Sequence, residues 1–463
     1  MKFREWLSLL YKKCVDFAKK KPTERALKEA MENEGLTNYG LYKLQEKKFK
    51  NLIQSIAKSN SFFKNKIEGQ DLTPEVIADN KQLIKIPPTT KQEIRDNFRQ
   101  MRGVPCGKFF EGRTSGSTGV ALKFYNDSFS LAWADACKWR GRSWHGASRH
   151  SSSLVLWGQP IYLGLFGKMK WNLKNYLHNI RFFNTFENLS EKFLKEVCDC
   201  LLSSKPKYIY GYGSSIAALS QFMKRRGIRI NYRPMFVQFT ADHMSRSERE
   251  TAEEVFDCQV VSDYGSSEAP GIAEECEYRN LHISIDNYIV EILGEDGSEV
   301  PMGSVGEVTI TALHAFGFPL VRYRTGDLGR KIEGVCECGR PFPLFHLEAG
   351  KAVDLISTSW VANVSAHVLD YINLKLMNEN IPGIAQFFLE QISRDGFTLS
   401  IVRDEPFYER SVEVFLQELR SYLGAKIDVD VIFVEQIPMT VGGKRRYFGK
   451  ARDFSSELLD AST

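Results

Sequence analysis

The chain lacks the segments that would anchor it in a membrane or carry it across one. No apolar run within its 463 residues approaches the roughly 18 to 20 residues of a membrane-spanning helix. The N-terminal stretch MKFREWLSLLYKKCVDFAKKK has no uninterrupted apolar core and no small-residue cleavage site, so it does not resemble a secretory signal. We therefore expect a cytoplasmic protein.

Strong charge, a disulfide framework and the common nucleotide loop are also missing. The formal net charge is only +5, from 62 basic and 57 acidic residues, so we expect no nucleic-acid partner. The spacing G-x-x-x-x-G-K-[ST] of P-loop NTPases does not occur. Nine cysteines, an odd number in a chain without an export signal, favour free thiols or metal ligands over disulfides.

The middle of the chain alternates between strand-like and helix-like patterns. Strand-like runs occur at residues 153–157, 208–210, 235–239 and 259–261. Helical periods such as 190–203 and 247–256 separate them, and a Gly-Tyr-Gly turn at 211–213 follows the second run. Strands joined by helices of this length predict parallel crossovers and an α/β core. From His282 onward, longer alternating runs predict antiparallel strands that form a β subdomain.

The C-terminal part predicts a separate, small α+β domain. An Asp-Gly turn at residues 395–396 joins two alternating runs into a hairpin, and a helix at 409–422 and a strand at 429–434 follow. We place the domain boundary at Gly350. The predicted fold is therefore a large N-terminal domain, residues 1–349, with a helical lead-in at 1–100, and a C-terminal domain, residues 350–463.

The first segment predicts an amphipathic helix. Its apolar residues recur every three or four positions, and most of its lysines lie off that face. The predicted apolar face consists of Phe3, Trp6, Leu10, Cys14 and Phe17. Two interpretations remain open, namely peripheral contact of residues 2–21 with an anionic membrane and packing of the helix on its own domain.

A loop rich in glycine and hydroxyl groups is the first candidate binding site. It consists of Thr114, Ser115, Gly116, Ser117, Thr118 and Gly119. Glycine lets backbone N–H groups approach anionic oxygens, and the hydroxyl groups add donors, so the loop suits a polyphosphate. A polar hairpin turn is the alternative.

Three further stretches carry candidate ligands. The stretch Asp263 to Glu268 follows a predicted strand, where a carboxylate can hold Mg²⁺ against phosphate oxygens and Tyr264 can stack on a base. Asp327, in a predicted loop after Tyr323, suits the two hydroxyls of a ribose. Lys444, on a glycine-flexible loop, can stabilise negative charge developing in a phosphoryl transition state. Taken singly, each is also compatible with an ordinary surface turn.

Together and in this order, the four stretches resemble the adenylate-forming superfamily, and most closely the phenylacetate-CoA ligase family with its capsule-biosynthesis relatives. The resemblance runs from about Lys85 to Lys450 and includes Thr240-Ala241-Asp242, which is similar to a Gly-Ala-Glu stretch that lines adenine in that family. It implies an AMP-binding N-terminal domain and a mobile C-terminal domain. It also implies ATP-dependent conversion of a small carboxylic acid to an acyl- or aryl-adenylate, followed by transfer to CoA.

The resemblance also implies a role for individual residues. Residues 114–119 match the β/γ-phosphate loop, Tyr264 the adenine-stacking aromatic, Asp327 the ribose ligand and Lys444 the adenylation lysine. Glu268 matches the Mg²⁺ carboxylate. The implied catalytic residues are Lys444, Glu268 and Thr118. The remaining implied nucleotide-binding positions are Ala241, Asp242, Asp263, Gly265, Ser266 and Lys351.

Departures from the family pattern keep other functions open. The family hinge usually reads Gly-Arg-x-Asp-Asp, whereas here Lys351 replaces the arginine and Val353 the first aspartate. Lysine cannot bind bidentately, so we expect a weakened second half-reaction. One alternative is transfer of the acyl group to a carrier-protein thiol, or to a sugar amine or hydroxyl in surface polysaccharide biosynthesis. Another is a weakly active nucleotide-binding scaffold. Candidate residues for the acid pocket, which also suit ordinary packing, are Trp157, Tyr210, Tyr212 and Gln238.

Three cysteines and one histidine suggest a structural zinc site. Cys336 and Cys338 lie one residue apart in a predicted turn, and Cys276 precedes His282 by six residues. Such a set can complete a tetrahedral site, and the resemblance implies a zinc at matching positions. Unliganded thiols with an ordinary histidine are the alternative. The pair Cys198 and Cys200 has a similar spacing but lies in a helical pattern, so we expect no metal there.

Overall fold

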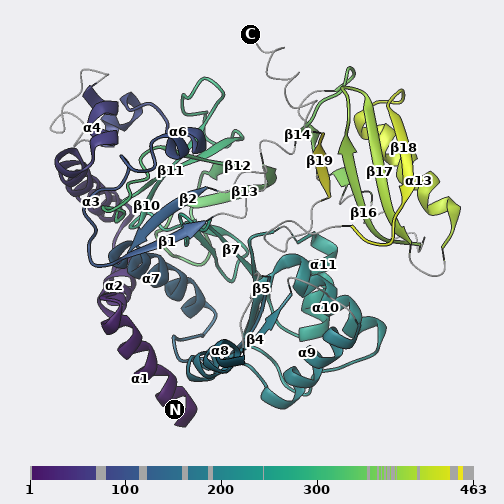
Figure 1. The fold of residues 1–463 in the computed structure, drawn as a ribbon, viewed down its shortest axis with the longest axis horizontal. Coiled ribbons are helices and arrows are strands. Elements are labelled where there is room, and N and C mark those ends of the chain that lie inside the picture. The colour runs from purple at the N-terminus through teal and green to yellow at the C-terminus, as the bar shows by residue number, and fades with distance from the viewer. Residues whose placement is uncertain are drawn as a thin grey trace. The chain divides into compact units, whose positions relative to one another are not determined.

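A computed structural model describes most of the chain (Figure 1). The described residues are 3–68, 80–113, 122–158, 165–185, 191–242, 244–351, 355–361, 364–366, 368–369, 372, 376, 381, 383–403, 407–437 and 447–451. They divide into two compact units, unit 1 from Met1 to Glu348 and unit 2 from Ala349 to Thr463. No helix among these residues is long and apolar enough to cross a membrane.

Unit 1 begins with helices, as the sequence predicts. They are α1 (Phe3–Ala18), α2 (Thr23–Glu32), η1 (Asn33–Gly35), α3 (Asn38–Ser59), α4 (Ser61–Glu68), η2 (Asn80–Lys85) and α6 (Lys91–Asp96). Thr90 caps α6 through a capping box: its hydroxyl accepts from the Glu93 N–H, and the Glu93 carboxylate accepts from the Thr90 N–H. The two prolines before this cap end the lead-in and fix where α6 starts.

An eleven-stranded sheet forms the body of unit 1, and its strands run in the order β10-β11-β12-β13-β9-β8-β7-β6-β5-β3-β4. In chain order the strands are β3 (Ser153–Trp157), β4 (Ile180–Asn184), β5 (Tyr208–Tyr212), β6 (Phe236–Thr240), β7 (Val260–Tyr264), β8 (Ala273–Glu275), β9 (Leu281–Ile283), β10 (Tyr288–Leu293), β11 (Gly306–Ala312), β12 (Tyr323–Ile332) and β13 (Leu344–Lys351). Strands β4, β3, β5, β6 and β7 pair in parallel, and the pairs from β7 to β8 and β8 to β9 are antiparallel. A separate hairpin joins β1 (Phe109–Arg113) and β2 (Lys123–Asp127).

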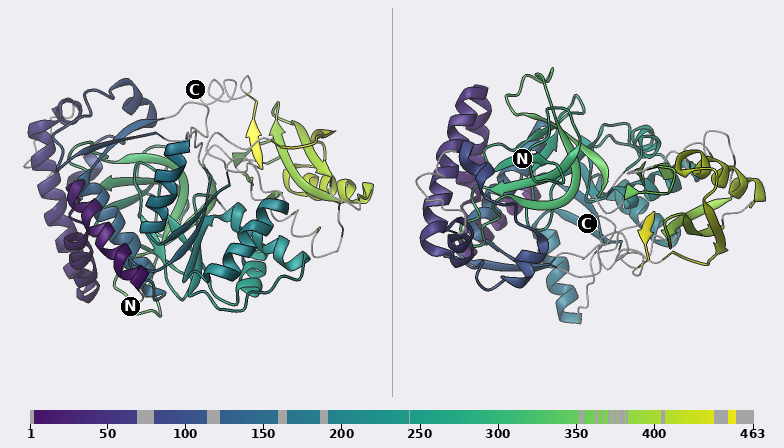
Figure 2. Two further views of the ribbon diagram at one scale, coloured as in Figure 1. Left: turned by 60° about the horizontal axis from the view of Figure 1, so that its bottom comes forward. Right: turned by 90° about the horizontal axis from the view of Figure 1, so that it is seen from above.

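Helices cover both faces of the parallel strands (Figure 2). They are α7 (Ser128–Trp144), α8 (Leu165–Leu177), α9 (Glu191–Ser204), α10 (Gly213–Arg225) and α11 (Arg246–Phe256). One face buries aliphatic residues such as Leu156, Ile209 and Val237 against α9, α10 and α11. The alternate residues of β5 and β6 face the other way, and two of them, Tyr210 and Gln238, lie directly opposite each other.

Three local predictions for unit 1 are wrong. Gly211 and Tyr212 continue β5, and Gly213 begins α10, so no turn follows residue 210. Glycine is required at 211 because a Cβ there would lie 2.6 Å from the Leu156 carbonyl oxygen of β3. The strand expected at 259–261 extends to Tyr264, and Asp327 lies within β12 and not in a loop. The sequence pattern also missed α8, β4 and α10.

Unit 2 is a four-stranded sheet with a covering helix. Its strands are β16 (Ile384–Gln391), β17 (Gly396–Arg403), β18 (Asp428–Phe433) and β19 (Phe448–Lys450), in the order β18-β17-β16-β19, and its helix is α13 (Glu409–Leu423). A short pair, β14 (Leu355–Ile356) with β15 (Val364–Ser365), precedes them. Phe387, Leu399 and Phe415 pack together in the hydrophobic core of unit 2. The predicted fold class, an α/β domain with a β subdomain and a small α+β domain, is confirmed.

Helix α1 packs on unit 1 through the face opposite to its apolar stripe. Its buried residues are Glu5, Ser8 and Asp16. Its predicted apolar stripe, which includes Phe3 and Phe17, is exposed. Burial of its own apolar face therefore does not explain how this helix is held.

Candidate functional site

The predicted nucleotide ligands of unit 1 leave the sheet at one edge. Strands β6 and β7 are parallel neighbours with Phe239 opposite Ser262, so Ala241 and Tyr264 lie at the same carboxyl end. This edge of a parallel sheet is where such folds bind ligands. Ala241 has a φ of +71°, a left-handed conformation that is strained for a residue with a Cβ.

Tyr264 and Asp327 are joined by a direct hydrogen bond. The Tyr264 hydroxyl donates to Asp327 Oδ2 over 3.0 Å. Asp327 reaches this position because β12 bulges away from β11: Val308 alone faces the three residues from Thr325 to Asp327. Burial, together with the Asp327 carboxylate, raises the pKa of Tyr264 well above its usual value, so the hydroxyl stays protonated and remains a donor.

Glu268 is a buried carboxylate with one oxygen unused. Its Oε1 accepts a hydrogen bond of 2.7 Å from the Tyr323 hydroxyl, while Oε2 is buried without a partner among the described residues. The residue is only 6% exposed. A buried oxygen without a donor is costly unless a ligand or cation satisfies it. Sequence reasoning did not give Tyr323 a role, although it lies in the same stretch as Asp327.

The turn between Tyr264 and Glu268 is tight. The Ala269 N–H donates to Ser266 Oγ, and a Cβ at Gly265 would lie 2.7 Å from the Gly271 nitrogen. Ser266 therefore closes a turn in the protein. Ser266 thus has a structural role that does not require a nucleotide. The turn that it closes also fixes the position of Glu268 after β7.

Asp263 and Glu274 form a buried acidic pair that faces α7. They lie opposite each other on β7 and β8, and both Asp263 oxygens and Glu274 Oε1 are buried without a hydrogen-bond partner among the described residues. Burial and the Asp263 charge raise the pKa of Glu274 well above its usual value. Burial alone would lower the pKa of Lys138, but its neighbours Tyr210, Asp263 and Glu274 outweigh burial and raise the pKa to about 12. Lys138 and Arg142 of α7 therefore offset the negative charge of the acidic pair.

Asp242 has a structural contact of its own. Its carboxylate accepts hydrogen bonds from the Gly213 N–H and from the Ser214 hydroxyl, which is 2.6 Å away. These are the contacts of a helix cap, and they hold the first turn of α10 against the end of β6. A role for Ala241 and Asp242 at the adenine stays a prediction.

Several predicted residues lie outside the described part of the chain. They are Thr114, Ser115, Gly116, Ser117, Thr118, Gly119, Val353 and Lys444. For Lys351 the backbone is described as the last residue of β13, without its side chain. Their predicted roles stay predictions.

A cavity of about 530 Å³ lies against the α7 face of the parallel strands. Its aromatic lining is Trp139, Trp157, Trp171, Phe182, Tyr208 and Tyr210, and its charged lining is Lys12, Asp16, Lys19, Lys21, Asp135, Arg142, Arg149 and Lys174. At one end, the Trp157 and Tyr212 ring centroids are 4.5 Å apart, and Tyr212 directly precedes the helix turn that Asp242 caps. The cavity therefore extends along the sheet away from the predicted nucleotide edge.

Arg142 links this cavity to the acidic pair. Its Nε donates to Gln238 Oε1 over 2.8 Å, and Gln238 Nε2 donates in turn to Glu274 Oε2 over 3.2 Å. The guanidinium lies 4.6 Å from the centroid of the Tyr210 ring. Of the predicted pocket residues, Trp157 and Tyr210 line the cavity, Gln238 orients Arg142, and Tyr212 packs against Trp157.

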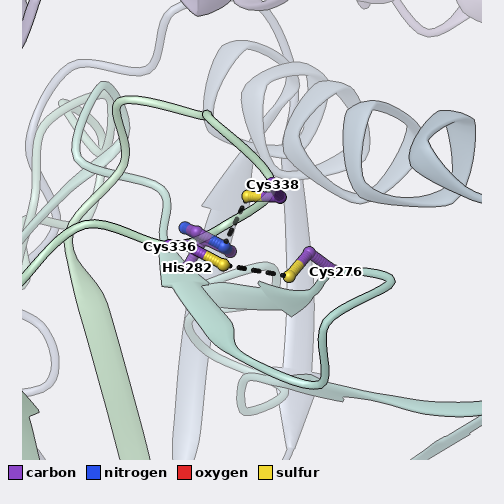
Figure 3. A group of neighbouring side chains, drawn as sticks. All are labelled: Cys276, His282, Cys336 and Cys338. Carbon is purple, nitrogen blue, oxygen red and sulfur yellow. Dashed lines mark hydrogen bonds between the residues drawn. The ribbon is translucent and has the colours of Figure 1, made fainter.

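The predicted metal ligands come together beside the hairpin of β8 and β9 (Figure 3). The ligand atoms of Cys276, His282, Cys336 and Cys338 all lie within 4.8 Å of one another. The Sγ atoms of Cys276 and Cys336 are 3.7 Å apart, and Cys338 Sγ is 3.3 Å from His282 Nε2. Two thiolates on one tetrahedral zinc would be separated by about 3.8 Å, from Zn–S bonds of about 2.3 Å.

His282 is held in the form that ligates a metal. Its Nδ1 lies 3.0 Å from the Phe342 carbonyl oxygen, which can only accept, so Nδ1 carries the proton and the Nε2 lone pair faces the thiols. Burial lowers the pKa of His282, which keeps the ring neutral. By contrast, Cys198 and Cys200 lie in α9, where Cys198 packs in the apolar core, and they belong to no such group among the described residues.

Comparison with known proteins agrees with the geometry. The model of the CapK C-terminal domain family matches residues 364–450, within unit 2. Protein CapK of Staphylococcus aureus is 21% identical over 418 residues and covers 88% of this chain and 88% of its own length. A phenylacetate-coenzyme A ligase of Thermus thermophilus is 23% identical over 464 residues, which cover 90% of this chain and 97% of that protein.

Solved structures show the same fold. A 2-hydroxyisobutyryl-CoA ligase in the postadenylation state, in complex with R3-HIB-AMP, superposes with a TM-score of 0.69 at 17% identity, and covers 90% of this chain and 91% of its own. The chain is thus similar in sequence to these relatives over most of its length and shares the fold of this CoA ligase. The resemblance stated from the sequence motifs is confirmed, and so is the prediction that the protein is an enzyme of this ligase class.

Proposed function

We propose that this protein uses ATP to activate a small carboxylic acid as its adenylate and then transfers the acyl group to CoA. The observation that carries the proposal is the strand-edge group of unit 1, where Tyr264, Asp327 and Glu268 are fixed by hydrogen bonds while one Glu268 oxygen stays unsatisfied. Its composition suits a nucleotide and a divalent cation. The distant phenylacetate-CoA ligase relatives support the reaction type.

In this proposal each residue of the group has a separate task. The Tyr264 ring borders the base, and Asp327, oriented by the Tyr264 hydroxyl, receives the ribose hydroxyls. Glu268, oriented by the Tyr323 hydroxyl, offers Oε2 to Mg²⁺, whose charge offsets that of the phosphates when the ion is bound. The acid's carboxylate attacks the α-phosphorus and pyrophosphate leaves, with Lys444 stabilising the charge that gathers there.

We assign the cavity beside Trp157 to the body of the acid. Its aromatic walls would hold a ring or chain, while the carboxylate would point toward the Tyr212 end. Two of the cavity's cations are already paired, Arg149 with Asp16 and Lys21 with Asp135. Lys12, Lys19 and Lys174 have no carboxylate within ion-pair distance among the described residues. The unbalanced positive charge favours an acid that carries a second, distal anionic group.

The pKa values of the lining support the same charge assignment. Burial, and then the charges of Lys12, Lys174, Lys19 and Arg149, lower the pKa of His178 to about 4. Burial, and then Arg149 and Arg142, lower the pKa of Lys12 to about 7. Burial is the larger cause in both cases, and the cationic neighbours that add to it belong to the excess of positive charge in the cavity.

The CapK relatives are the reason to test a second acceptor for the acyl group. The CapK C-terminal domain model matches unit 2, and the CapK protein covers most of the chain. These matches favour, as the second candidate, transfer of the acyl group to a carrier thiol or to a sugar in surface polysaccharide synthesis. The altered hinge at Lys351 points the same way, since the CoA step depends on that hinge in the family.

We propose zinc for the four-residue group of Cys276, His282, Cys336 and Cys338. All four ligands come from the protein, so no position is left for a substrate and the role would be structural. The ion would tie the turn at 336–338 to strands β8 and β9, and β8 pairs directly with β7, which ends at Tyr264.

Exchange of labelled pyrophosphate into ATP tests the activation step. The panel contains phenylacetate, 4-carboxyphenylacetate and fatty acids, each with and without CoA. Acid-dependent exchange together with acyl-CoA formation is the expected result. Exchange without any CoA conjugate would assign the second candidate. If no acid supports exchange, the proposal fails and a nucleotide-binding scaffold takes its place.

A further inference from the structure

Two neighbouring helices of unit 1 expose apolar stripes. On α1 the exposed apolar residues are Phe3, Trp6, Leu10 and Phe17, and on α8 they are Phe166, Met169, Leu173 and Tyr176. Successive members of each set lie three, four or seven residues apart, so each set forms one stripe along its helix. Phe17 is 88% exposed and Phe166 is 89% exposed. We call these eight residues the α1–α8 surface.

The outward direction of the α1 stripe is fixed by polar contacts on the opposite side. Glu5 forms an ion pair with Lys207 over 2.6 Å, and Asp16 forms one with Arg149 over 2.8 Å. Turning α1 to bury its apolar residues would break both half-buried pairs and leave their charges unsatisfied. The helix therefore keeps its polar face inside and its apolar face outside.

The two helices adjoin. The Arg4 guanidinium of α1 lies 4.4 Å from the centroid of the Tyr176 ring of α8, and the Tyr11 ring meets the His178 ring edge-on with centroids 4.9 Å apart. Both helices lie low in the view of Figure 1. Eight large apolar side chains on two touching helices exceed what a scatter of single exposed residues produces.

The polar residues around the stripes are cationic. Exposed lysines on and next to the two helices that do not line the acid cavity are Lys13, Lys20, Lys168 and Lys170. The two acidic residues of α1, Glu5 and Asp16, are buried and paired, and α8 contains none. An apolar stripe bordered by lysines and free of exposed acids is the pattern of a helix that lies in the interface of an anionic bilayer.

We propose that the α1–α8 surface docks this protein on the surface of an anionic lipid bilayer. The aromatic and aliphatic side chains enter the headgroup region, and the lysines meet lipid phosphates. A second copy of the chain fits the surface poorly, because it would bring two lysine-rich faces together. The docking is independent of the proposed reaction, although the helices that make the surface also line the acid cavity through Lys12 and Trp171.

Sedimentation with vesicles tests the proposal on the whole protein. The probes are vesicles of phosphatidylcholine alone and of phosphatidylcholine with phosphatidylglycerol in equal parts. The variant Phe17→Ser/Phe166→Ser removes two uncovered side chains. The variant Lys168→Gln/Lys170→Gln removes two charges. The control Val104→Ser/Met302→Ser removes two other exposed apolar residues, 67% and 60% exposed, from loops outside the surface.

We expect the wild type and the control to bind anionic vesicles and to bind neutral ones much less. The serine pair lowers the partition coefficient by about tenfold or more, from the apolar area it removes. The glutamine pair lowers it by about fivefold per lysine, and added salt has the same effect. Failure of the wild type to bind anionic vesicles overturns the proposal, as does equal binding by the serine pair. A wild-type dimer that the serine pair converts to a monomer, without vesicle binding, assigns the surface to a second copy instead.

Discussion

The hydroxyl of Tyr264 and the carboxylate of Asp327 meet over 3.0 Å, although 62 residues separate them in the chain. One lies at the end of a parallel strand of the sheet, and the other lies in the bulge of an antiparallel strand. The contact uses Asp327 Oδ2 and leaves Oδ1 without a hydrogen-bond partner among the described residues. It thereby couples the residue predicted to border the base with the residue predicted to bind the ribose.

Tyr264→Phe should weaken nucleotide binding without removing the ring. The variant keeps the stacking on Phe345, whose centroid is 5.5 Å away, and loses the hydroxyl's hydrogen bond to Asp327 and its longer contact of 3.4 Å with Thr325 Oγ1. We expect the KM for ATP in pyrophosphate exchange to rise about five- to tenfold, from the loss of about 1 kcal/mol or more, with a small change in kcat. The matched control is Tyr288→Phe, which loses a buried hydroxyl bonded to the Pro270 carbonyl and should leave this KM unchanged. A rise of equal size in both variants would show a general loss of packing.

Glu268→Gln should impair the use of Mg²⁺. The amide oxygen can still accept from the Tyr323 hydroxyl, so the local structure is preserved while the negative charge is lost. We expect exchange to fall by about 100-fold or more and the Mg²⁺ concentration at half-maximal rate to rise, in line with about 3 kcal/mol for a lost charged ligand. An unchanged Mg²⁺ profile would remove this role from Glu268.

The features that the sequence predicted correctly are those set by residues close together in the chain or by rare residue types. The hairpin at residues 395–396 and the strand at 153–157 were predictable because turn and alternation patterns act over a few residues. The four metal-ligand candidates were also identified correctly as one group, because cysteine and histidine are few and their spacing is distinctive.

What the sequence could not show depends on tertiary contacts. The bulge that brings Asp327 to Tyr264 arises from strand pairing, so Asp327 was assigned to a loop. The sequence left open whether the apolar stripe of α1 packs on its own domain, because the buried face is held by ion pairs with Lys207 and Arg149, residues that lie far away in the chain. Helix periodicity alone assumes that the apolar stripe is buried.

Binding of an acid with a distal anion should depend on pH through Lys12. The pKa of this lysine is lowered to about 7, so the protonated form prevails below that pH and the neutral form above it. An anion in the cavity raises the pKa, and binding therefore takes up a proton when the pH exceeds 7. The charged and titratable groups around the ammonium are Arg142, Arg149, Asp16, Asp135, His178 and Lys174.

We expect the Kd for 4-carboxyphenylacetate, followed by quenching of the cavity tryptophans, to be smallest below pH 7 and to rise by about tenfold per pH unit above it. 4-Methylphenylacetate, which lacks the distal charge, should show no such rise. Lys12→Met should raise the first Kd by about 10- to 100-fold at pH 6 and abolish the pH dependence, while the exposed neighbour Lys13→Met should change neither. Equal affinity for the two acids would contradict the assignment, whether or not the enzyme supports exchange.

Removal of zinc should destabilise unit 1 more than an ordinary core substitution does. The ion would hold Cys276, His282, Cys336 and Cys338 in place of a larger apolar core, so Cys336→Ser leaves an incomplete site. We expect about one zinc per chain in the purified wild type by elemental analysis, and a content near zero in Cys336→Ser. The midpoint of thermal unfolding should fall in that variant, and in the wild type treated with chelator.

The matched control for zinc is Cys198→Ser, which alters a buried thiol that belongs to a pair with the same Cys-x-Cys spacing in α9. It should lower the unfolding midpoint through the burial of a hydroxyl in an apolar core while leaving the zinc content unchanged. This separates loss of metal from loss of packing, because only the first responds to added zinc. A wild type that contains no zinc, or that loses zinc without any change in the unfolding midpoint, would leave the four side chains as a cluster of free thiols around a neutral histidine.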